Sequence, residues 1–138
     1  MEKNTYIIHT DGGSRNNPGE AAIGVVIERN RTLVHEFGKT IGIATNNVAE
    51  YTAVVEALQY MKTIEKTGKY SIHFILDSQL VVNQLNGIFK IKDSTLREFV
   101  FQVRHLEQEV GGHISYEAVR REQNKRADYF VNHALDEA

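Results

Sequence analysis

Residues 6–41 read YIIHTDGGSRNNPGEAAIGVVIERNRTLVHEFGKTI, and this stretch decides the predicted fold. Three segments in it are rich in β-branched and aromatic residues, which favour strands. A dense cluster of turn-forming residues separates the first two segments, and a tight two-residue turn separates the last two. Because both connections are short, the strands are expected to form an antiparallel meander. The strands span residues 6–10, 21–29 and 32–41, and the turns lie at 11–19 and 30–31.

The chain then changes to the spacing of a helix. Apolar residues between Val48 and Ile64 recur every three or four positions, which indicates an amphipathic helix. Later elements are predicted from apolar or alternating runs and from capping residues that precede periodic runs. They are a helix from 45–47 to Gly68, a strand over 71–76, a short helix from Asp77 or Ser78 to 86–87, a helix from Asp93 or Ser94 to 111–112, a strand over 113–119 and a helix that Asn124 caps.

The resulting order, βββαβααβα, predicts an α/β fold. A strand followed by a helix and another strand implies a parallel crossover. We therefore expect a mixed five-stranded sheet, with three antiparallel strands, two parallel crossover strands and helices on both faces. At this length, residues 1–138 are expected to form a single domain.

Composition excludes several classes of protein. With 16 Lys and Arg against 18 Asp and Glu, the formal charge is −2, which argues against a polycationic nucleic-acid binder. The chain has no cysteine, so disulfides, thiolate metal sites and thiol nucleophiles are excluded. No apolar run is long enough to cross a membrane, and the first residues lack the apolar stretch of a signal peptide. We expect a cytoplasmic monomer that does not bind membranes.

Four carboxylates fall near the ends of predicted elements. Asp11 is placed where the first strand ends, and Asp77 where the fourth ends. If the crossover is parallel, both emerge at one edge of the sheet, where ligand sites of open α/β sheets lie. Glu50 falls in the opening turns of the first helix and Asp128 in those of the last helix, so both can reach the same edge.

Convergence of four acids would require compensation, because like charges at short distance repel. Mg²⁺ prefers oxygen ligands and suits phosphate substrates. Two such ions, about 3.5–4 Å apart, can activate a water and stabilise the leaving oxygen of a phosphodiester. Each acid also has a structural interpretation: Asp77 as a helix cap, Asp128 as an acid favoured by the helix dipole, Glu50 as a solvated helix residue and Asp11 as part of a turn.

The strings around these acids resemble four motifs of the type 1 ribonucleases H, in the order of that family. They are DGGSRNNPG at 11–19, TNNVAEY at 45–51, DSQ at 77–79 and NKRAD at 124–128. The resemblance covers nearly the whole chain and implies a ribonuclease H-like fold. It also implies endonucleolytic hydrolysis of the RNA strand of an RNA/DNA hybrid. In that case the four carboxylates hold two Mg²⁺ ions, with Mn²⁺ as a substitute, and these ions carry the attacking water and the 3′ leaving oxygen.

The same resemblance assigns contacts with the hybrid to polar neighbours of the acids. Amide side chains and the backbone of a Gly-rich turn can pair with a 2′-hydroxyl, which both donates and accepts. A plain turn at 16–19 and simple helix capping at 46–47 are the structural alternatives. The predicted contacts are Gly12, Gly13, Ser14, Asn16, Asn17, Thr45, Asn46, Gln79, Arg120 and Arg121.

The sequence departs from the family pattern in two places. Many members carry a histidine in a loop before the last helix, but residues 119–124 contain none. Arg120 or Arg121 could hold a phosphate there, and Glu122 could coordinate water. Some members also have a basic insertion, for which residues 88–95 leave no room. We therefore expect modest, strongly salt-dependent affinity for the hybrid.

Two other functions stay open at this point. One is a different nuclease of the wider fold, of the resolvase, exonuclease or transposase kind, since these also use clustered acids. The other is a catalytically weak or inactive nucleic-acid-binding protein that keeps the fold, which the missing histidine and short basic region favour. Parallel cleavage assays would identify the first, and absence of Mg²⁺ or Mn²⁺ binding would favour the second.

Overall fold

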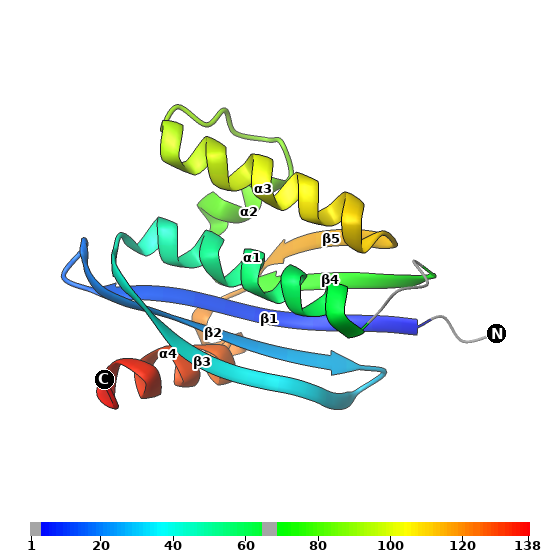
Figure 1. The fold of residues 1–138 in the computed structure, drawn as a ribbon, viewed down its shortest axis with the longest axis horizontal. Helices are drawn as coiled ribbons and strands as arrows, with labels where there is room; N and C mark the ends of the chain where they lie inside the picture. The colour runs from blue at the N-terminus through cyan, green and yellow to red at the C-terminus, as the bar shows by residue number, and fades with distance from the viewer. Residues whose placement is uncertain (1–3, 65–68) are drawn as a thin grey trace.

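A computed structural model describes residues 4–64 and 69–138, which form a five-stranded mixed sheet with helices on both faces (Figure 1). The strand order is β3-β2-β1-β4-β5. The first three strands pair antiparallel, and β1–β4 and β4–β5 pair parallel, as predicted. The elements are β1 (Asn4–Arg15), β2 (Gly19–Arg29), β3 (Thr32–Ala44), α1 (Asn46–Ile64), β4 (Tyr70–Leu76), α2 (Gln79–Leu85), α3 (Ser94–Val110), β5 (His113–Ala118), a 3₁₀ turn η1 (Arg121–Gln123) and α4 (Lys125–Asp136).

The meander strands are longer than predicted, and this corrects the position of Asp11. β1 continues through the Gly-rich segment to Arg15, where it pairs with Glu20 of β2. Turn-forming residues stay extended here because the buried residues of β2 hold them in the ladder. Asp11 therefore lies inside β1, opposite Gly24, and not at the end of the strand. The tight turn at Asn30-Arg31 is confirmed, since both residues have positive φ, as in a primed hairpin turn.

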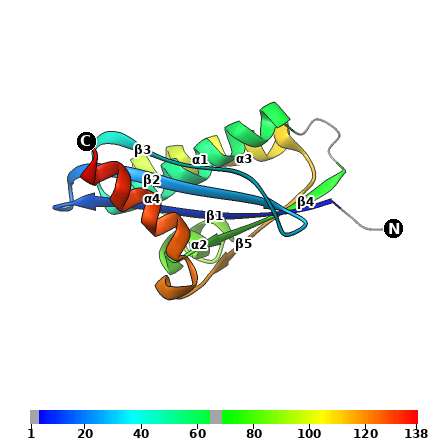
Figure 2. The same cartoon turned by 90° about the horizontal axis from the view of Figure 1, so that it is seen from below.

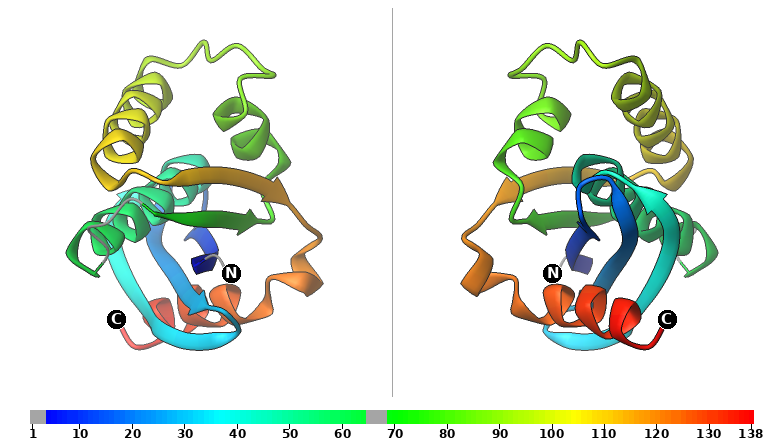
Figure 3. Two further views of the ribbon diagram at one scale, coloured as in Figure 1. Left: turned by 90° about the vertical axis from the view of Figure 1, so that its right-hand side faces the viewer. Right: turned by 90° about the vertical axis from the view of Figure 1, so that its left-hand side faces the viewer.

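The helices form two layers around the sheet. α1 packs on β1 over one face, and α3 packs on α1, while α4 covers β2 and β3 on the opposite face (Figures 1 and 2). Viewed from the ends of the molecule, α2 and α3 both lie on the side of β4 and β5 that is away from α4, one at each side of the view (Figure 3). The main core lies between the α1 face of the sheet and the helices; Ile8, Leu58 and Phe74 are fully buried in it.

Two glycines let helices approach the sheet closely. A Cβ at Gly12 would lie 2.3 Å from the backbone carbon of Ala49 in α1. A Cβ at Gly24 would lie 2.1 Å from the backbone oxygen of Ala127 in α4. Both neighbours are backbone atoms, which cannot rotate aside, so a side chain at either glycine would push the helix outward. Gly12 and Gly24 thereby fix how close α1 and α4 lie to β1 and β2.

The helix boundaries agree largely with the predicted caps. Ser78, not Asp77, caps α2, with Oγ accepting from Val81 N, and Asp93 caps α3 by accepting from Leu96 N. Gly111 ends α3 as predicted. The predicted end of the first helix at Gly68 falls outside the described residues. Among the described helices, none has the length and apolar character needed to cross a membrane.

Candidate active site

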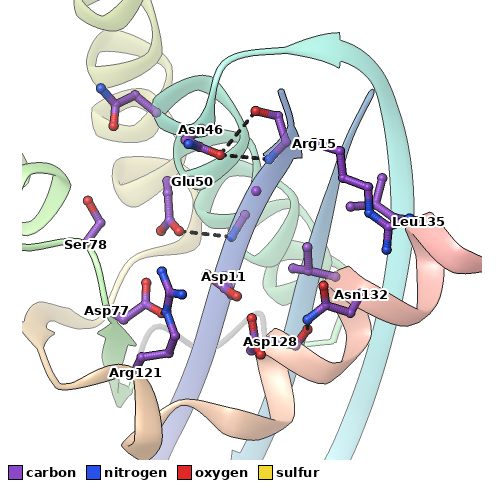
Figure 4. Close-up of a pocket in the computed structure, with 15 residues that line it drawn as sticks. Asp11, Arg15, Asn46, Glu50, Asp77, Ser78, Arg121, Asp128, Asn132 and Leu135 are labelled. Atoms are coloured by element: carbon purple, nitrogen blue, oxygen red, sulfur yellow. Dashed lines mark hydrogen bonds and ion pairs between the residues drawn. The ribbon is translucent and has the colours of Figure 1, made fainter. Parts of the chain in front are cut away.

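Four carboxylates from separate parts of the chain line one cavity of about 450 Å³ (Figure 4). β1 contributes Asp11, α1 contributes Glu50, and Asp77 follows the last residue of β4. Asp128 comes from the first turn of α4. All four predicted carboxylates thus line the same cavity. The complete lining is Asp11, Gly12, Gly13, Ser14, Arg15, Asn46, Asn47, Glu50, Asp77, Ser78, Arg121, Asp128, Val131, Asn132 and Leu135.

Three of the acids form a compact group of oxygen ligands. One carboxylate oxygen from each of Asp11, Glu50 and Asp77 lies within 4.8 Å of the other two. Asp11 is 6% exposed and Glu50 is 5% exposed. Glu50 Oε1 accepts a hydrogen bond of 3.1 Å from Gly12 N, while its buried Oε2 has no hydrogen-bond partner among the described residues. A divalent cation with oxygen preference fits this arrangement, because it would satisfy that oxygen and offset the clustered charge.

Asp128 stands beside this group, and Asn124 fixes the helix that carries it. The Asn124 side chain is 1% exposed; its Nδ2 donates to Thr10 O at 2.8 Å, and its Oδ1 lies 2.9 Å from His9 Nδ1. Asn124 occupies the N-cap position as predicted, but its side chain makes no capping hydrogen bond. Both of its polar ends bind β1 just before Asp11, so the start of α4 is anchored to the strand that carries the central acid.

Burial dominates the electrostatics of the cluster. It raises the pKa of Asp11 to about 7; interaction with the Glu50 side chain opposes this shift, while repulsion from Asp77 and Asp128 adds to it. Burial, reinforced by the neighbouring Asp11 charge, raises the pKa of Glu50 well above its ordinary value. Burial also raises the pKa of Asp77, and Arg121 partly offsets that effect. At pH values between the ordinary carboxylate pKa and the raised pKa, the metal-free folded protein therefore keeps protons on this cluster that the unfolded chain has already lost.

The metal-free protein is consequently expected to lose stability as pH rises from about 4 to 7. In this window the folded state binds more protons than the unfolded state, so the free energy of unfolding falls by about 1.4 kcal/mol per pH unit for each extra proton. Mg²⁺ should replace the protons and restore stability at pH 8, with little effect at pH 5. Urea unfolding in chelator and in Mg²⁺ measures both. The prediction would be contradicted if the free energy of unfolding in chelator rose from pH 5 to 8 and Mg²⁺ left it unchanged.

The predicted contacts with nucleic acid divide into two groups. Gly12, Gly13, Ser14, Asn46 and Arg121 line the cavity. The other five lie outside this lining, and several have structural partners. Thr45 Oγ1 caps α1 by accepting from Val48 N, and Gln79 Nε2 donates to Asn83 Oδ1 at 2.9 Å. The predicted residues outside the lining are Asn16, Asn17, Thr45, Gln79 and Arg120.

Asn46 connects the two Gly- and Asn-rich segments at the mouth of the cavity. Its Oδ1 accepts from Ser14 N at 2.8 Å and from Ser14 Oγ at 3.2 Å. Its backbone N donates to Asn17 Oδ1 at 2.9 Å. Asn16 adopts φ of 65°, a left-handed conformation that asparagine tolerates in turns. The capping and turn alternatives therefore describe part of what these residues do, and the same hydrogen bonds hold the end of β1 against the start of α1.

The structure also adds residues that the sequence interpretation did not select. Asn132 lines the cavity one helical turn after Asp128, and the four-residue spacing could have identified it. Arg15 lines the cavity at the end of β1 and had been assigned to the turn. In the segment that lacks the loop histidine, Arg121 Nε lies 3.9 Å from Asp77 Oδ2, and its side chain is 82% exposed. Two histidines of the strands have side-chain partners within the fold: His9 contacts Asn124, and His73 contacts Ser115 and Glu117.

Comparisons with known proteins agree on one group. A family described as reverse transcriptase-like matches residues 9–134. The bifunctional protein Rv2228c of Mycobacterium tuberculosis is 38% identical over 134 residues, which cover 96% of this chain and 36% of that protein. Ribonuclease HI of Halobacterium salinarum is 42% identical over 131 residues, covering 93% of this chain and 63% of that protein. The chain thus spans less than two thirds of the length of these relatives.

Solved structures match along almost the whole chain. RNase H1 from Halobacterium salinarum has a TM-score of 0.90 at 39% identity, with 97% of this chain and 99% of that chain covered. LC11-RNase H1, isolated from compost by a metagenomic approach, was solved in complex with an RNA/DNA hybrid. That complex has a TM-score of 0.92 at 40% identity and covers 96% of this chain and 97% of the other.

Proposed function

The chain belongs to the type 1 ribonuclease H family, within the reverse-transcriptase-like proteins, and we propose that it hydrolyses the RNA strand of RNA/DNA hybrids. The observation that carries the proposal is the compact group of carboxylates from β1, α1 and the end of β4, of which Asp11 and Glu50 are buried. Its relative LC11-RNase H1 binds such a hybrid in its crystal structure, which supports the substrate class. We further propose that residues 1–138 act as one catalytic domain and as a monomer, and that the enzyme acts in the cytoplasm.

Asp11, Glu50 and Asp77 would hold Mg²⁺ through carboxylate oxygens, with Asp128 completing the acid set. Binding of two ions, and Mn²⁺ as a substitute, are proposals that follow from the family. When bound, the cations supply an activated water and stabilise the charge of the departing 3′ oxygen. The chain itself positions the ligands: Gly12 N holds Glu50, and Asn124 anchors α4 next to Asp11. Burial of Asp11 and Glu50 excludes bulk water from the floor of the site.

The RNA strand would lie over the Gly-rich part of β1. Ser14 and Asn46 form one side of the cavity, and hydrogen bonds between them hold their backbones in place. Hydroxyl, carboxamide and backbone groups at this position can pair with a 2′-hydroxyl, which is the feature that distinguishes RNA from DNA. We propose that they select the RNA strand for cleavage.

A labelled-hybrid cleavage assay in Mg²⁺ and in Mn²⁺ tests this function. Hydrolysis of the RNA strand, with no cleavage of duplex DNA, single strands or branched DNA, is the expected result. Preferred cleavage of branched or duplex DNA would identify a different nuclease of the same fold. Failure to cut any substrate, together with no Mg²⁺ or Mn²⁺ binding by calorimetry, would identify a non-catalytic binding protein. In that case no cation would explain why the buried Glu50 Oε2 lacks a hydrogen-bond partner among the described residues.

Arg121 is expected to contribute to substrate binding in place of the missing loop histidine. Its guanidinium lines the cavity beside Asp77 and is exposed enough to reach a phosphate. Replacing Arg121 with Gln should raise KM for the hybrid about fivefold, since exposed charge contacts contribute up to about 1 kcal/mol. Arg120→Gln is the matched control, because Arg120 lies outside the cavity lining and should change KM less. Equal effects of the two substitutions would show that only the net charge of the segment matters.

A further inference from the structure

The cavity continues past the carboxylates along β1. Residues two apart on a strand face the same side, so Asp11, Gly13 and Arg15 share the face that looks toward α4. At a rise of about 3.3 Å per residue, Arg15 lies roughly 13 Å along the strand from Asp11. Gly13 lies between them without a side chain, and all three residues line the cavity. β1 therefore provides an acid, an open stretch of backbone and a cation, in that order.

The opposite wall comes from α4. Asp128, Asn132 and Asp136 follow one another at four-residue spacing, so they lie along one side of the helix. Asp128 lies near Asp11, and Asn132, one turn further along α4, also lines the cavity. At the far end, Asp136 Oδ1 accepts a hydrogen bond from Arg15 Nη2. The part of the cavity between β1 and α4, from the acid cluster to Arg15, is called the channel below; Asp136 lies outside the cavity lining and contacts it through Arg15.

Charge is distributed unevenly along this channel. Among the described residues that line it, the basic ones are Arg15 and Arg121, and Figure 4 shows them on opposite sides of the acids. The ion pair of Arg15 with Asp136 joins two side chains that are 49% and 64% exposed. Exposed pairs contribute little to stability, so this one adds little to the fold. A stronger anionic partner can therefore displace Asp136 from Arg15 at small cost.

We propose that Arg15 binds a phosphate of the cleaved strand outside the linkage held at the carboxylates, and that Asp136 competes with this phosphate. The inference rests on the proposed function, because a polynucleotide carries phosphates on both sides of the linkage that is cut. The carboxylates with their cations would hold the linkage that is cut, so a cation at the other end of the channel is suited to hold the strand in register. Guanidinium groups match phosphate oxygens with paired hydrogen bonds, which makes arginine suited to this position.

Hybrid binding in the Asp11→Asn background, where cleavage is strongly reduced, tests the proposal in both directions. Adding Arg15→Gln should weaken affinity about three- to tenfold at low salt and reduce the slope of log affinity against log salt by about one. Adding Asp136→Asn should strengthen affinity about two- to fivefold, because the competitor is gone. Two substitutions are the charge-matched controls. Arg29→Gln changes the last residue of β2, at the end of that strand away from Arg15, and Glu137→Gln changes the exposed residue next to Asp136. Equal effects of Arg15→Gln and Arg29→Gln would overturn the proposal.

Single neutral methylphosphonates, placed one at a time along the RNA-strand backbone of the hybrid, locate the contact. In the Asp11→Asn protein, one substitution outside the cleaved linkage should weaken binding, and Arg15→Gln should abolish that penalty while leaving the others. Penalties that are identical with and without Arg15 would refute the contact. If the wild-type protein neither binds nor cuts the unmodified hybrid, the proposed function itself fails. If it does both but Arg15 has no effect, only this inference fails.

Discussion

Replacing Asp11 with Asn is expected to reduce hybrid cleavage by about a thousandfold or more. Asp11 is the most central of the four acids, with Glu50 and Asp77 close to its oxygens and Asp128 raising its pKa. The substitution keeps the shape of the side chain and removes one negative charge, so it weakens cation binding without opening a cavity. Loss of several kcal/mol of charge stabilisation corresponds to the stated factor. Single-turnover cleavage of a labelled hybrid in saturating Mg²⁺ measures it.

The control for Asp11→Asn is Asp93→Asn. Asp93 caps α3 far from the cavity, and Asn is an equally good capping residue, so activity and folding should be unchanged. The Asp11→Asn protein should also be at least as stable as the wild type at pH 8 without metal, because it no longer buries that carboxylate. Cleavage by Asp11→Asn at the wild-type rate would show that the acids have been assigned to the wrong role. Loss of folding by this variant would show that Asp11 is structural.

Replacing Gly12 with Ala is expected to destabilise the protein by about 3 kcal/mol or more, a large effect for one methyl group. The new Cβ would lie 2.3 Å from the Ala49 carbon, 2.4 Å from its oxygen and 2.5 Å from Glu50 N. Since these are backbone atoms, α1 must move away from β1, which also separates Glu50 from Gly12 N. Urea unfolding at pH 7 with and without Mg²⁺ measures the loss, and calorimetry measures the accompanying loss of Mg²⁺ affinity.

Gly13→Ala is the matched control, because it adds the same methyl group one residue along the same strand. There the Cβ would meet Val131 Cγ1 at 3.7 Å, an ordinary van der Waals contact. Its effect on the free energy of unfolding should stay within about 1 kcal/mol. If the two substitutions destabilise the protein equally, the general cost of removing glycine from β1 explains the effect, and close approach of α1 does not.

The sequence predicted the order of the elements and the cavity acids because these depend on local patterns. Apolar periodicity identified α1, and the polar residues around Asp77 marked the end of β4. The position of Asp11 was wrong because Gly12, Gly13 and Ser14 favour turns on their own, while pairing with the buried residues of β2 keeps them extended. That pairing is a tertiary effect that a local pattern does not contain.

The contacts that position the site were also hidden from the sequence. Asn124 has the residue type and place of a helix cap, yet its side chain binds Thr10 and His9, more than a hundred residues away. Arg15 and Asp136 are separated by 121 positions, so no local signal connects them. In both cases the packing of α4 against β1 supplied a partner that is distant in the sequence.

The four carboxylates span almost the entire chain, from residue 11 in β1 to residue 128 in α4. The proposed cation site therefore requires the meander, both parallel crossovers and the last helix to be in place together. Such long-range contacts form slowly during folding, and no short fragment contains all four carboxylates. Divalent-cation binding can consequently serve as a probe for native topology. In refolding experiments we expect it to develop with the last cooperative step and not with the early formation of helices.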